Sequence, residues 1–452
     1  MNALSLRVRS VELYERPVVL RLPFRFGAAT VTRCPQAFVR VEADVGAQRT
    51  VGATAELMVP KWFDKSPGLT HEQNVEQLRE SLRVAREAYL AEPQPMAPHA
   101  LSLQAGDAAV VRCVALGLPR LAAQFGAAEL DKAVADAALR AAGVDFVRGV
   151  RAGVLGDPQA SQLALQAPAR VNLRHTVGMA DRLTHADPGT DPRDGLPATL
   201  DDAVAEYGLR YFKLKLAGQA GPDLDRLARI AAVLDVNARD WHVTLDGNET
   251  FDSADALAAW WRAFLADPRL RVLRQRTLLL EQPLARRVAL AEDIGPLDIG
   301  VPVILDESDD DDDVFERGLA LGYRGISSKA CKGLYRSLAN AVRVAREPQR
   351  LRLSGEDLTC QAGLAVQQDT LLAASLGVTH IERNGHHYVR GFGAAPAGEA
   401  RAFAAAHPTL YRADGDAAVL AVRDGRLDLS SLHVPGFASS AQPSWQDLIP
   451  LH

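Results

Sequence analysis

The sequence predicts an α/β protein: a (β/α)8 barrel of the TIM type that follows an N-terminal α+β capping domain. Two observations support this fold class. The first 60 residues alternate apolar and polar side chains with a period of two, and helical periodicity then takes over. From about residue 165, eight short apolar segments alternate with helical stretches over about 230 residues. A barrel of this type usually needs about 250 residues.

The capping domain is expected to begin with antiparallel strands. In residues 37–45 (AFVRVEADV), the apolar side chains fall on one face and Arg40, Glu42 and Asp44 on the other, as in a strand with one buried face. Its predicted neighbours are residues 9–22 and 50–59. Helices are predicted where Val75, Leu78, Leu82, Ala85 and Tyr89 share one face, near 107–124 and near 127–142.

Eight segments of the second half are predicted to be the parallel strands of the barrel, because strands that alternate with helices pair through right-handed crossovers. They are 169–177, 210–216, 241–246, 278–283, 301–307, 323–329, 351–357 and 379–385. The expected organisation is a capping domain over 1–150, a barrel over 165–395 and a segment over 396–452 that returns to the capping domain. That last segment contains a hairpin signal with Asp-Gly at the turn, VRDGRLDL.

Composition excludes several classes of function. The net charge is −5 with no basic stripe, so we expect no nucleic-acid partner. We expect no membrane partner either, because the sequence has no run of about 18 apolar residues. The four cysteines are scattered and no signal peptide is evident, which favours a reduced, cytoplasmic protein. We also expect a homo-oligomer.

Ionisable residues end most of the predicted barrel strands. Lys213 and Lys215 end the second strand, in YFKLKLAG, and the next four strands end at Asp246, Glu281, Asp306 and Lys329. Each step along the chain is close to one βα unit, so these side chains should meet at the C-terminal rim, where barrel active sites lie. An Asp after a strand is more often a helix cap, but the conjunction of three acids and three lysines is hard to obtain by accident.

Three converging carboxylates repel one another and therefore imply a bound cation. Oxygen ligands on rigid strands suit Mg²⁺. A lysine beside such a cation is expected to have a lowered pKa and to act as a base near neutral pH. Lys215, nearer the rim, should reach the reacting carbon, while Lys213 should support the metal site or hold down the pKa of its neighbour.

These motifs resemble those of the enolase superfamily, and within it the muconate lactonizing enzyme-like group of the mandelate racemase/muconate lactonizing enzyme family. The matching stretches are KLK, LDGNE, LEQP, LDES and SKACKG, and the resemblance covers most of the chain. It implies Asp246, Glu281 and Asp306 as ligands of one Mg²⁺. It implies Lys215 and Lys329 as acid/base residues on opposite faces of the substrate, with Lys213 as the auxiliary lysine. The histidine that the mandelate racemase-like group would place on strand seven has no counterpart in LRLSGEDL.

The resemblance implies Mg²⁺-dependent removal of a proton α to a carboxylate, through a metal-stabilised enediolate. Racemisation or epimerisation by two opposed lysines is the first expectation. The alternatives are a lyase of the o-succinylbenzoate synthase or acid-sugar dehydratase type, a cycloisomerase, or a barrel retained only for binding. The expected partner is a small carboxylate-containing substrate, whose identity the sequence does not give.

Substrate contacts are predicted from the capping loops and from the ends of strands seven and eight: Arg25, Glu356, Asp357, Glu382 and Asn384, with Lys61 and Trp62 as further candidates. Loop 184–202 is expected to be a second lid on the catalytic face. Other residues that could suggest a metal site or a nucleophile are assigned structural or substrate-contact roles. The acidic run DESDDDDD should lead into a helix N-terminus, His386 and His387 should be loop or substrate-contact residues, Lys332 should lie beyond the strand, and Cys360 should pack in the core.

Overall fold

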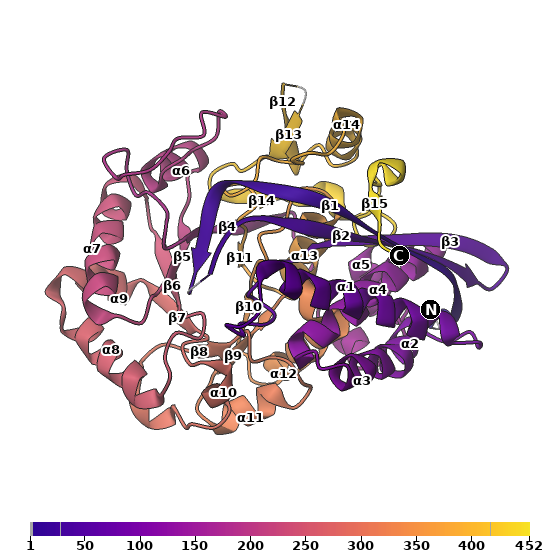
Figure 1. Cartoon of the computed structure of the whole chain (residues 1–452), viewed down its shortest axis with the longest axis horizontal. Helices are drawn as coiled ribbons and strands as arrows, with labels where there is room; N and C mark the ends of the chain where they lie inside the picture. The colour runs from indigo at the N-terminus through magenta and orange to yellow at the C-terminus, as the bar shows by residue number, and fades with distance from the viewer. Residues whose placement is uncertain (1–2, 28, 416) are drawn as a thin grey trace.

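The computed structural model describes residues 3–27, 29–415 and 417–452. In the capping domain, three antiparallel strands, β1 (Leu6–Phe26), β2 (Ala29–Val45) and β3 (Gln48–Leu57), form one sheet. Helices cover one face of this sheet, and the far end of the β1–β2 ribbon reaches over the barrel (Figure 1). The predicted strands 9–22 and 37–45 therefore fall within β1 and β2, and the predicted strand 50–59 overlaps β3 but extends two residues beyond its end.

The helices of the capping domain differ from the prediction in one place. α1 (His71–Ala91) begins at a capping box between Thr70 and Gln73 and buries the expected apolar face. The predicted helix over 107–124 is wrong, because α3 (Asp107–Ala115) ends before Gly117, which has φ 91°, and Pro119. A long helix, α4 (Arg120–Ala142), starts after that proline. Short α2 (Pro98–Leu101), a π-helical turn over Ser102–Gly106 and α5 (Phe146–Arg151) complete the domain.

β3 and α4 approach each other closely. A Cβ at Gly52 would lie 2.0 Å from the carbonyl oxygen of Ala133, so only glycine allows this contact. The close packing places buried Glu129 and Lys132 of α4 against the end of β3. This joint lies beside the barrel, because Thr54 of β3 donates a hydrogen bond to Gln368 of the barrel helix α13 (Leu364–Ser375).

Eight parallel strands close the barrel. Seven of the predicted segments contain one of them, and the segment 278–283 overlaps the remaining one, which begins one residue earlier. The eight strands are β4 (Arg170–Val177), β5 (Tyr211–Lys215), β6 (His242–Asp246), β7 (Thr277–Glu281), β8 (Val303–Leu305), β9 (Gly325–Ser328), β10 (Arg352–Gly355) and β11 (His380–Glu382). Pairing of β11 with β4 completes the circle. The (β/α)8 barrel with a capping domain is thus confirmed.

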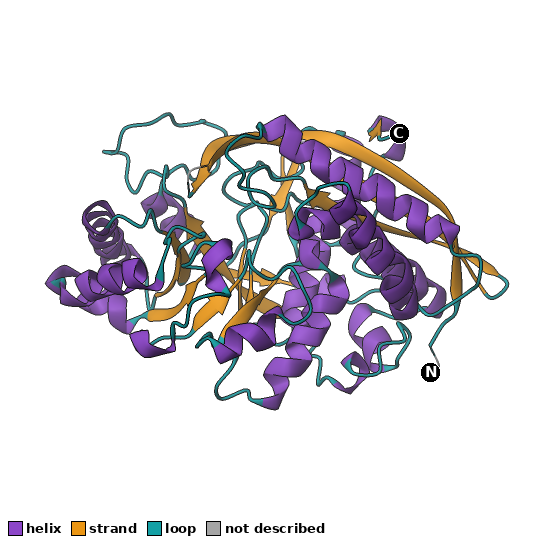
Figure 2. Cartoon of the chain, turned by 60° about the horizontal axis from the view of Figure 1, so that its bottom comes forward, coloured by secondary structure: helices purple, strands orange, loops and turns teal. Residues whose placement is uncertain are grey.

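Helices surround the barrel, as Figure 2 shows. They are α6 (Leu200–Tyr207), α7 (Ala220–Asn237), α8 (Ala254–Ala266), α9 (Arg271–Gln275), α10 (Arg286–Ala289), α11 (Val314–Ala320), α12 (Leu334–Arg346) and α13. No described helix is long and apolar enough to cross a membrane.

The last part of the chain contacts both halves of the molecule. After α14 (Ala397–Ala406) and the hairpin β12 (Tyr411–Asp414)–β13 (Ala417–Leu420), the predicted Asp424-Gly425 turn forms, with φ 50° and 68°. The strand after it, β14 (Arg426–Asp428), pairs with β4 of the barrel instead of forming a full hairpin. β15 (Ile449–Pro450) then joins the capping sheet beside β1. The domain boundaries expected from the sequence stay predictions.

Candidate active site

The mouth of the barrel collects the charged strand ends. On β5, Phe212 and Leu214 point into the core between the helices and the sheet, and both are fully buried. Lys213 and Lys215 take the alternate positions of the same strand, so they share the inner face. The exposed fraction of the Lys213 side chain is only 1%. A buried ammonium requires partners, and the neighbouring strand ends supply them.

Lys213 lies among four carboxylates. Its Nζ is 2.9 Å from Asp246 Oδ2, 2.8 Å from Glu281 Oε2, 2.7 Å from Glu356 Oε2 and 3.0 Å from Glu382 Oε2. Four strand ends, β6, β7, β10 and β11, therefore meet at one ammonium. Arg174 of β4 holds Glu356 from the other side and is itself completely buried.

Lys215 and Lys329 stand on either side of this cluster. Lys215 Nζ is 2.6 Å from Asp246 Oδ2, and Lys329 Nζ is 2.5 Å from Asp306 Oδ2. Both lysines line a cavity of about 20 Å³, the lysine cavity, and they reach it from the second and sixth strands of the barrel. The structure therefore brings the two predicted acid/base residues to one small space.

The capping domain covers each lysine with an aromatic ring. Phe24 of β1 lies with its ring centroid 5.8 Å from Lys215 Nζ, and the Trp62 ring centroid is 4.3 Å from Lys329 Nζ. Both distances suit a cation–π contact. Phe26 and Val59 complete the apolar cover. The roof of the lysine cavity is thus apolar, while its floor is charged.

The pKa values of these groups follow from the ion pairs. Burial lowers the pKa of Lys213, but the carboxylates of Asp246, Glu281 and Glu356 outweigh it, so this pKa lies well above its usual value. The pKa of Lys329 is also raised, because Asp306 outweighs burial. The lowering of a lysine pKa that is expected beside a bound cation stays a prediction, because these shifts arise where ammonium groups alone neutralise the carboxylates.

The carboxylates of the mouth fit a further cation. Five of them (Asp246, Glu281, Asp306, Glu356 and Glu382) face Arg174, Lys213, Lys215 and Lys329. Lys332 also lies 3.4 Å from Asp306 but is closer to Asp309, at 2.9 Å. When all are ionised, the five carboxylates and Asp309 exceed these five cations by one negative charge. Burial, and then repulsion from Asp246 and Glu356, raise the pKa of Glu281 well above its usual value. Its Oε2 accepts no hydrogen bond of good geometry. A divalent cation would stabilise this carboxylate, and its extra charge would balance a substrate carboxylate.

The carboxylate oxygens of the three predicted metal ligands are spread more widely than those of a second group of possible ligands. In the described part of the chain, their oxygens do not all lie within 4.8 Å of one another, whereas ligand atoms of Asp357, Cys360 and Asp369 do. That second group already has a cation, since Arg383 pairs with both of its carboxylates, 2.7 Å from Asp357 Oδ1. The lysine ion pairs set the spacing of the first group.

Asp306 is also held from behind by Lys332. This lysine lies in a 3-10 turn (Ala330–Lys332) beyond β9, as expected, and it is buried. Its Nζ contacts Asp309 Oδ2 at 2.9 Å and Ser327 Oγ at 2.8 Å, and Ser327 donates a hydrogen bond to Asp306. Lys332 does not line the lysine cavity, so its place is that of a support for Asp306.

The predicted substrate contacts divide into two groups. Asp357 and Glu382 line the lysine cavity, whereas Glu356 lies deeper, against Arg174, and Asn384 donates to Glu382 from outside. Arg25 is exposed. Since side chains alternate along a strand and Phe24 and Phe26 face inward, Arg25 must face outward, and its prediction as a substrate contact is wrong.

Other predicted residues take structural places. Trp62 covers Lys329, but Lys61 donates to the carbonyl oxygens of Ser66 and Leu69. His386 and His387 are buried; His386 Nε2 lies 2.9 Å from His175 Nδ1, and neither lines the lysine cavity. Cys360 is buried, as expected. Ala28, within the predicted capping loop, lies outside the described residues.

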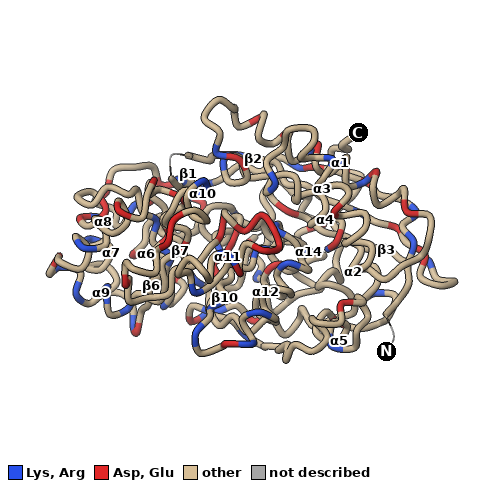
Figure 3. The backbone as a smooth tube through the Cα atoms, turned by 90° about the horizontal axis from the view of Figure 1, so that it is seen from below, with Lys and Arg blue, Asp and Glu red and all other residues tan. Residues whose placement is uncertain are grey.

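The acidic run leads into α11, as expected, and Figure 3 shows it as a continuous stretch of acidic residues there. It also forms contacts that the sequence did not indicate. The Asp311 carboxylate pairs with Arg120 of the capping domain at 2.9 Å, and the Asp310 carbonyl accepts from Gln124 at 2.5 Å. The run therefore joins the barrel to α4.

Sequence reasoning missed several charged residues of the mouth. Arg174 lies inside a predicted barrel strand whose sequence did not mark it as functional. It reaches Glu356 because β4 pairs with β11 when the barrel closes. Glu307 is fully buried, accepts from Asn248 Nδ2 at 2.9 Å and lies 3.5 Å from Lys65 Nζ. The signal was present, since Asn248 belongs to the LDGNE stretch and Glu307 to LDES.

The geometry agrees with known structures. No family model matches the sequence, and no curated protein matches it significantly. Solved structures do match. Muconate lactonizing enzyme from Pseudomonas fluorescens, complexed with muconolactone, has a TM-score of 0.62 and 15% identity over 97% of each chain. Dipeptide epimerase from Cytophaga hutchinsonii has a TM-score of 0.64 and 13% identity over 98% of this chain and 99% of that one.

A mandelate racemase/muconate lactonizing protein from Herpetosiphon aurantiacus is similar over 95% of this chain and 98% of its own, with a TM-score of 0.62 and 17% identity. These likenesses extend over both the capping sheet and the barrel. The chain therefore has the fold of the mandelate racemase/muconate lactonizing enzyme family of the enolase superfamily.

Proposed function

We propose that the protein is a Mg²⁺-dependent racemase or epimerase that removes the proton α to the carboxylate of a small substrate and returns a proton to the opposite face. The observation that carries this proposal is the shared lysine cavity. Lys215 and Lys329 line it from the second and sixth strands, and the three predicted metal ligands end the strands between them.

Asp246, Glu281 and Asp306 are the residues that would hold the metal. Bound there, Mg²⁺ would supply positive charge beside the substrate carboxylate and so stabilise the negative charge that develops when the α-proton leaves. Lys213 supports this arrangement, because its ammonium fixes the Asp246 and Glu281 carboxylates at 2.9 and 2.8 Å.

The two lysines have complementary tasks. To act on one enantiomer, Lys215 must hold a neutral amine that accepts the proton, and Lys329 must hold an ammonium that donates one. For the other enantiomer the tasks are exchanged. Each amine has its own carboxylate, Asp246 for Lys215 and Asp306 for Lys329, which can stabilise the ammonium form when it arises.

The cover of the cavity indicates the substrate class. Phe24, Phe26, Val59, Trp62 and Leu358 form its apolar lining, and the Arg25 side chain is turned away from it. The charged groups of the floor are all engaged with one another. We therefore propose a substrate with a carboxylate on one side of the reacting carbon and an uncharged, apolar substituent on the other.

A proton-exchange screen tests this function. The enzyme with Mg²⁺ in D2O is incubated with single enantiomers of α-substituted carboxylates, including N-acylated amino acids, dipeptides and acid sugars. We expect α-deuterium together with inversion for a member with an apolar substituent, and no exchange after removal of Mg²⁺ by a chelator. Exchange that is unaffected by the chelator would overturn the metal-dependent function.

A further inference from the structure

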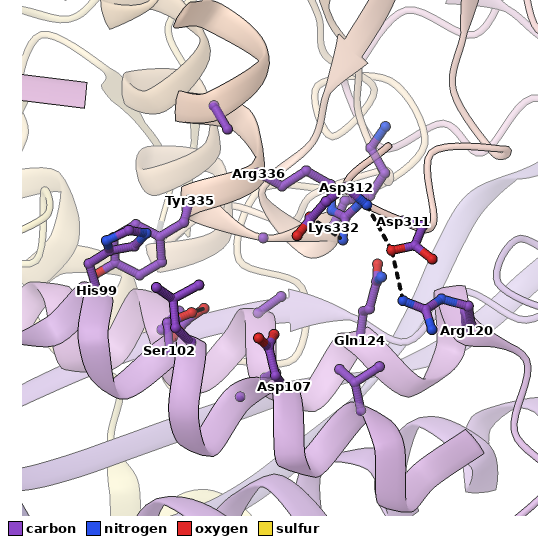
Figure 4. A pocket seen from close by; sticks show the side chains of 18 of the residues that line it. His99, Ser102, Asp107, Arg120, Gln124, Asp311, Asp312, Lys332, Tyr335 and Arg336 are labelled. Atoms are coloured by element: carbon purple, nitrogen blue, oxygen red, sulfur yellow. Dashed lines mark hydrogen bonds and ion pairs between the residues drawn. The ribbon is translucent and has the colours of Figure 1, made fainter. Parts of the chain in front are cut away.

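A second cavity, of about 230 Å³, lies at the seam between the capping domain and the barrel. We call it the seam cavity; Figure 4 shows it from close by. Its capping wall comes from α2, the π-helical turn Ser102–Gly106, α3 and α4, and its barrel wall from the acidic run and α12. Domain seams are common places for small-molecule sites, and π-helical turns are frequent at functional sites.

Two buried polar groups in the walls of this cavity have no hydrogen-bond partner. Tyr335 is 8% exposed and Gln124 is 5% exposed, and both line the cavity. The hydroxyl of Tyr335 and the amide oxygen of Gln124 are left without a partner, although Gln124 Nε2 donates to the carbonyl oxygen of Asp310. Since a buried polar group without a partner costs free energy, a ligand that donates to the Gln124 amide oxygen would be stabilised.

The cations of the cavity differ in how closely a carboxylate approaches them. Arg120, Arg343 and Lys332 each have a carboxylate within 3.0 Å. Arg336 is different, because its nearest carboxylate oxygens, on Asp309 and Asp312, are 3.5 Å away, and its Nε and Nη1 make no hydrogen bond.

On the capping side, Asp131 lines the cavity without an ion pair to any described residue, but its carboxylate accepts hydrogen bonds from the Tyr89 and Ser102 hydroxyls. Asp107 also forms no ion pair within 4.0 Å among the residues that the structure describes. It faces the same cavity as Arg336. Burial and the Asp312 charge raise the pKa of Asp107, and the Arg336 charge lowers it. The charges of Asp107 and Arg336 therefore interact across the cavity. Among the described residues, the Arg336 guanidinium has no carboxylate closer than 3.5 Å and the Asp107 carboxylate has no ion pair, so both remain for a ligand, from opposite walls.

We propose that the seam cavity binds a small zwitterion of the α-amino acid type. Its carboxylate accepts from the Arg336 guanidinium, and its ammonium donates to Asp107 and to the Gln124 amide oxygen. An anion alone would leave Asp107 unpaired, and a cation alone would leave Arg336 unpaired. Leu103, Val110 and Ala339 line the same space and accommodate an aliphatic side chain.

Such a ligand would join the capping domain to the barrel, so binding should stabilise the folded protein. The site is separate from the lysine cavity, and the inference does not depend on the proposed reaction. It is therefore tested without Mg²⁺, in the presence of a chelator, with the full chain.

The experiment compares three probes by isothermal titration calorimetry and thermal unfolding. The first, L-leucine, carries both charges; L-leucinamide lacks the carboxylate, and N-acetyl-L-leucine lacks the ammonium. We expect L-leucine to bind at least tenfold more tightly than either derivative and to raise the unfolding temperature. Equal binding of one derivative, or no binding of L-leucine or another aliphatic amino acid at millimolar concentration, would overturn the inference.

Variants locate the site. Arg336→Gln and Asp107→Asn should each weaken L-leucine binding at least tenfold. Arg346→Gln, at the exposed end of the same helix, is the matched control and should leave binding unchanged. Lys329→Met should also leave it unchanged. Loss of binding in Lys329→Met with no loss in Arg336→Gln would place the ligand in the lysine cavity and overturn the seam site.

Discussion

At the scale of single residues, the charge balance of the barrel mouth depends on Lys213. Its ammonium is the one cation that contacts Asp246, Glu281, Glu356 and Glu382 together in the part of the chain that the structure describes. These carboxylates lie at the ends of four different barrel strands. Without the ammonium, their mutual repulsion would destabilise the closed barrel. A buried ion cluster is costly to break because the remaining charges lose their partner.

Replacing Lys213 by methionine should therefore destabilise the fold by about 3–5 kcal/mol, the range for a buried pair that loses one partner. Urea unfolding measures the change. Lys215→Met is the matched control, since among the described residues Lys215 contacts only the Asp246 carboxylate within 4.0 Å and should matter less for folding. Equal losses in the two variants would contradict the central place given to Lys213.

The metal assignment also belongs to the residue scale. Asp246→Asn should weaken Mg²⁺ binding at least tenfold, because an amide is a poorer ligand for a hard cation than a carboxylate. Calorimetry with Mg²⁺ measures this affinity. Asp255→Asn, on the exposed side of α8, should bind Mg²⁺ as the unmodified protein does. Unchanged affinity in Asp246→Asn would reject Asp246 as a ligand.

At the scale of secondary-structure elements, the joint between β3, α4 and α13 contains a buried acid without full compensation. Glu56, at the end of β3, is completely buried and lies 3.5 Å from Lys132, which is itself paired with Glu129 at 2.8 Å. Burial raises the pKa of Glu56 from 4.5 to about 8, with Lys132 opposing the rise. The folded protein thus keeps a proton that the unfolded chain loses.

This joint predicts a loss of stability as the pH rises from about 4.5 to about 8, by at most about 1.4 kcal/mol per pH unit. The unfolded chain releases the Glu56 proton at the lower pH and the folded protein only at the higher one. Glu56→Gln should flatten the dependence of the unfolding free energy on pH in this window. The half-buried surface residue Glu42 provides the control Glu42→Gln. An unchanged slope in Glu56→Gln would contradict the assignment.

A second element-scale contact joins β1 to the loop that was expected to act as a lid. Arg21 binds both carboxylate oxygens of Asp194 and donates to the carbonyl oxygens of Leu196, Pro197 and His387. Arg21→Gln should therefore speed hydrogen exchange in residues 184–199. Arg25→Gln, on the exposed face of the same strand, should not. If exchange is equally fast in both variants, the contact does not hold the loop.

At the scale of the whole molecule, the barrel could be predicted because most of its strands repeat one pattern, an apolar segment that ends in a charged residue. The same repetition placed Lys213, Lys215, Asp246, Glu281, Asp306 and Lys329 at one rim. Contacts between distant segments could not be predicted this way. Arg174 needs the closure of the barrel, and the aromatic cover needs the docking of the capping domain. The error at Arg25 arose because the sequence alone did not give the phase of β1.

The stereochemistry of proton exchange tests the central claim, that Lys215 and Lys329 serve opposite faces of one carbon, most directly. The measurement follows α-deuterium uptake in D2O from each pure enantiomer of a substrate found in the screen, with Mg²⁺ present. Replacing Lys215 by alanine should abolish exchange of one enantiomer and leave exchange of the other, and Lys329→Ala should do the reverse. Neither variant should interconvert the enantiomers.

Circular dichroism and Mg²⁺ calorimetry check that the variants are folded. Both variants should keep the unmodified spectrum and the unmodified Mg²⁺ affinity, because neither lysine is a predicted metal ligand. The account predicts two complementary losses, one per lysine. If either variant still racemises at the unmodified rate, the two-base arrangement is contradicted. If one lysine proves necessary for exchange of every substrate and both enantiomers, the protein is a lyase or cycloisomerase with a single base.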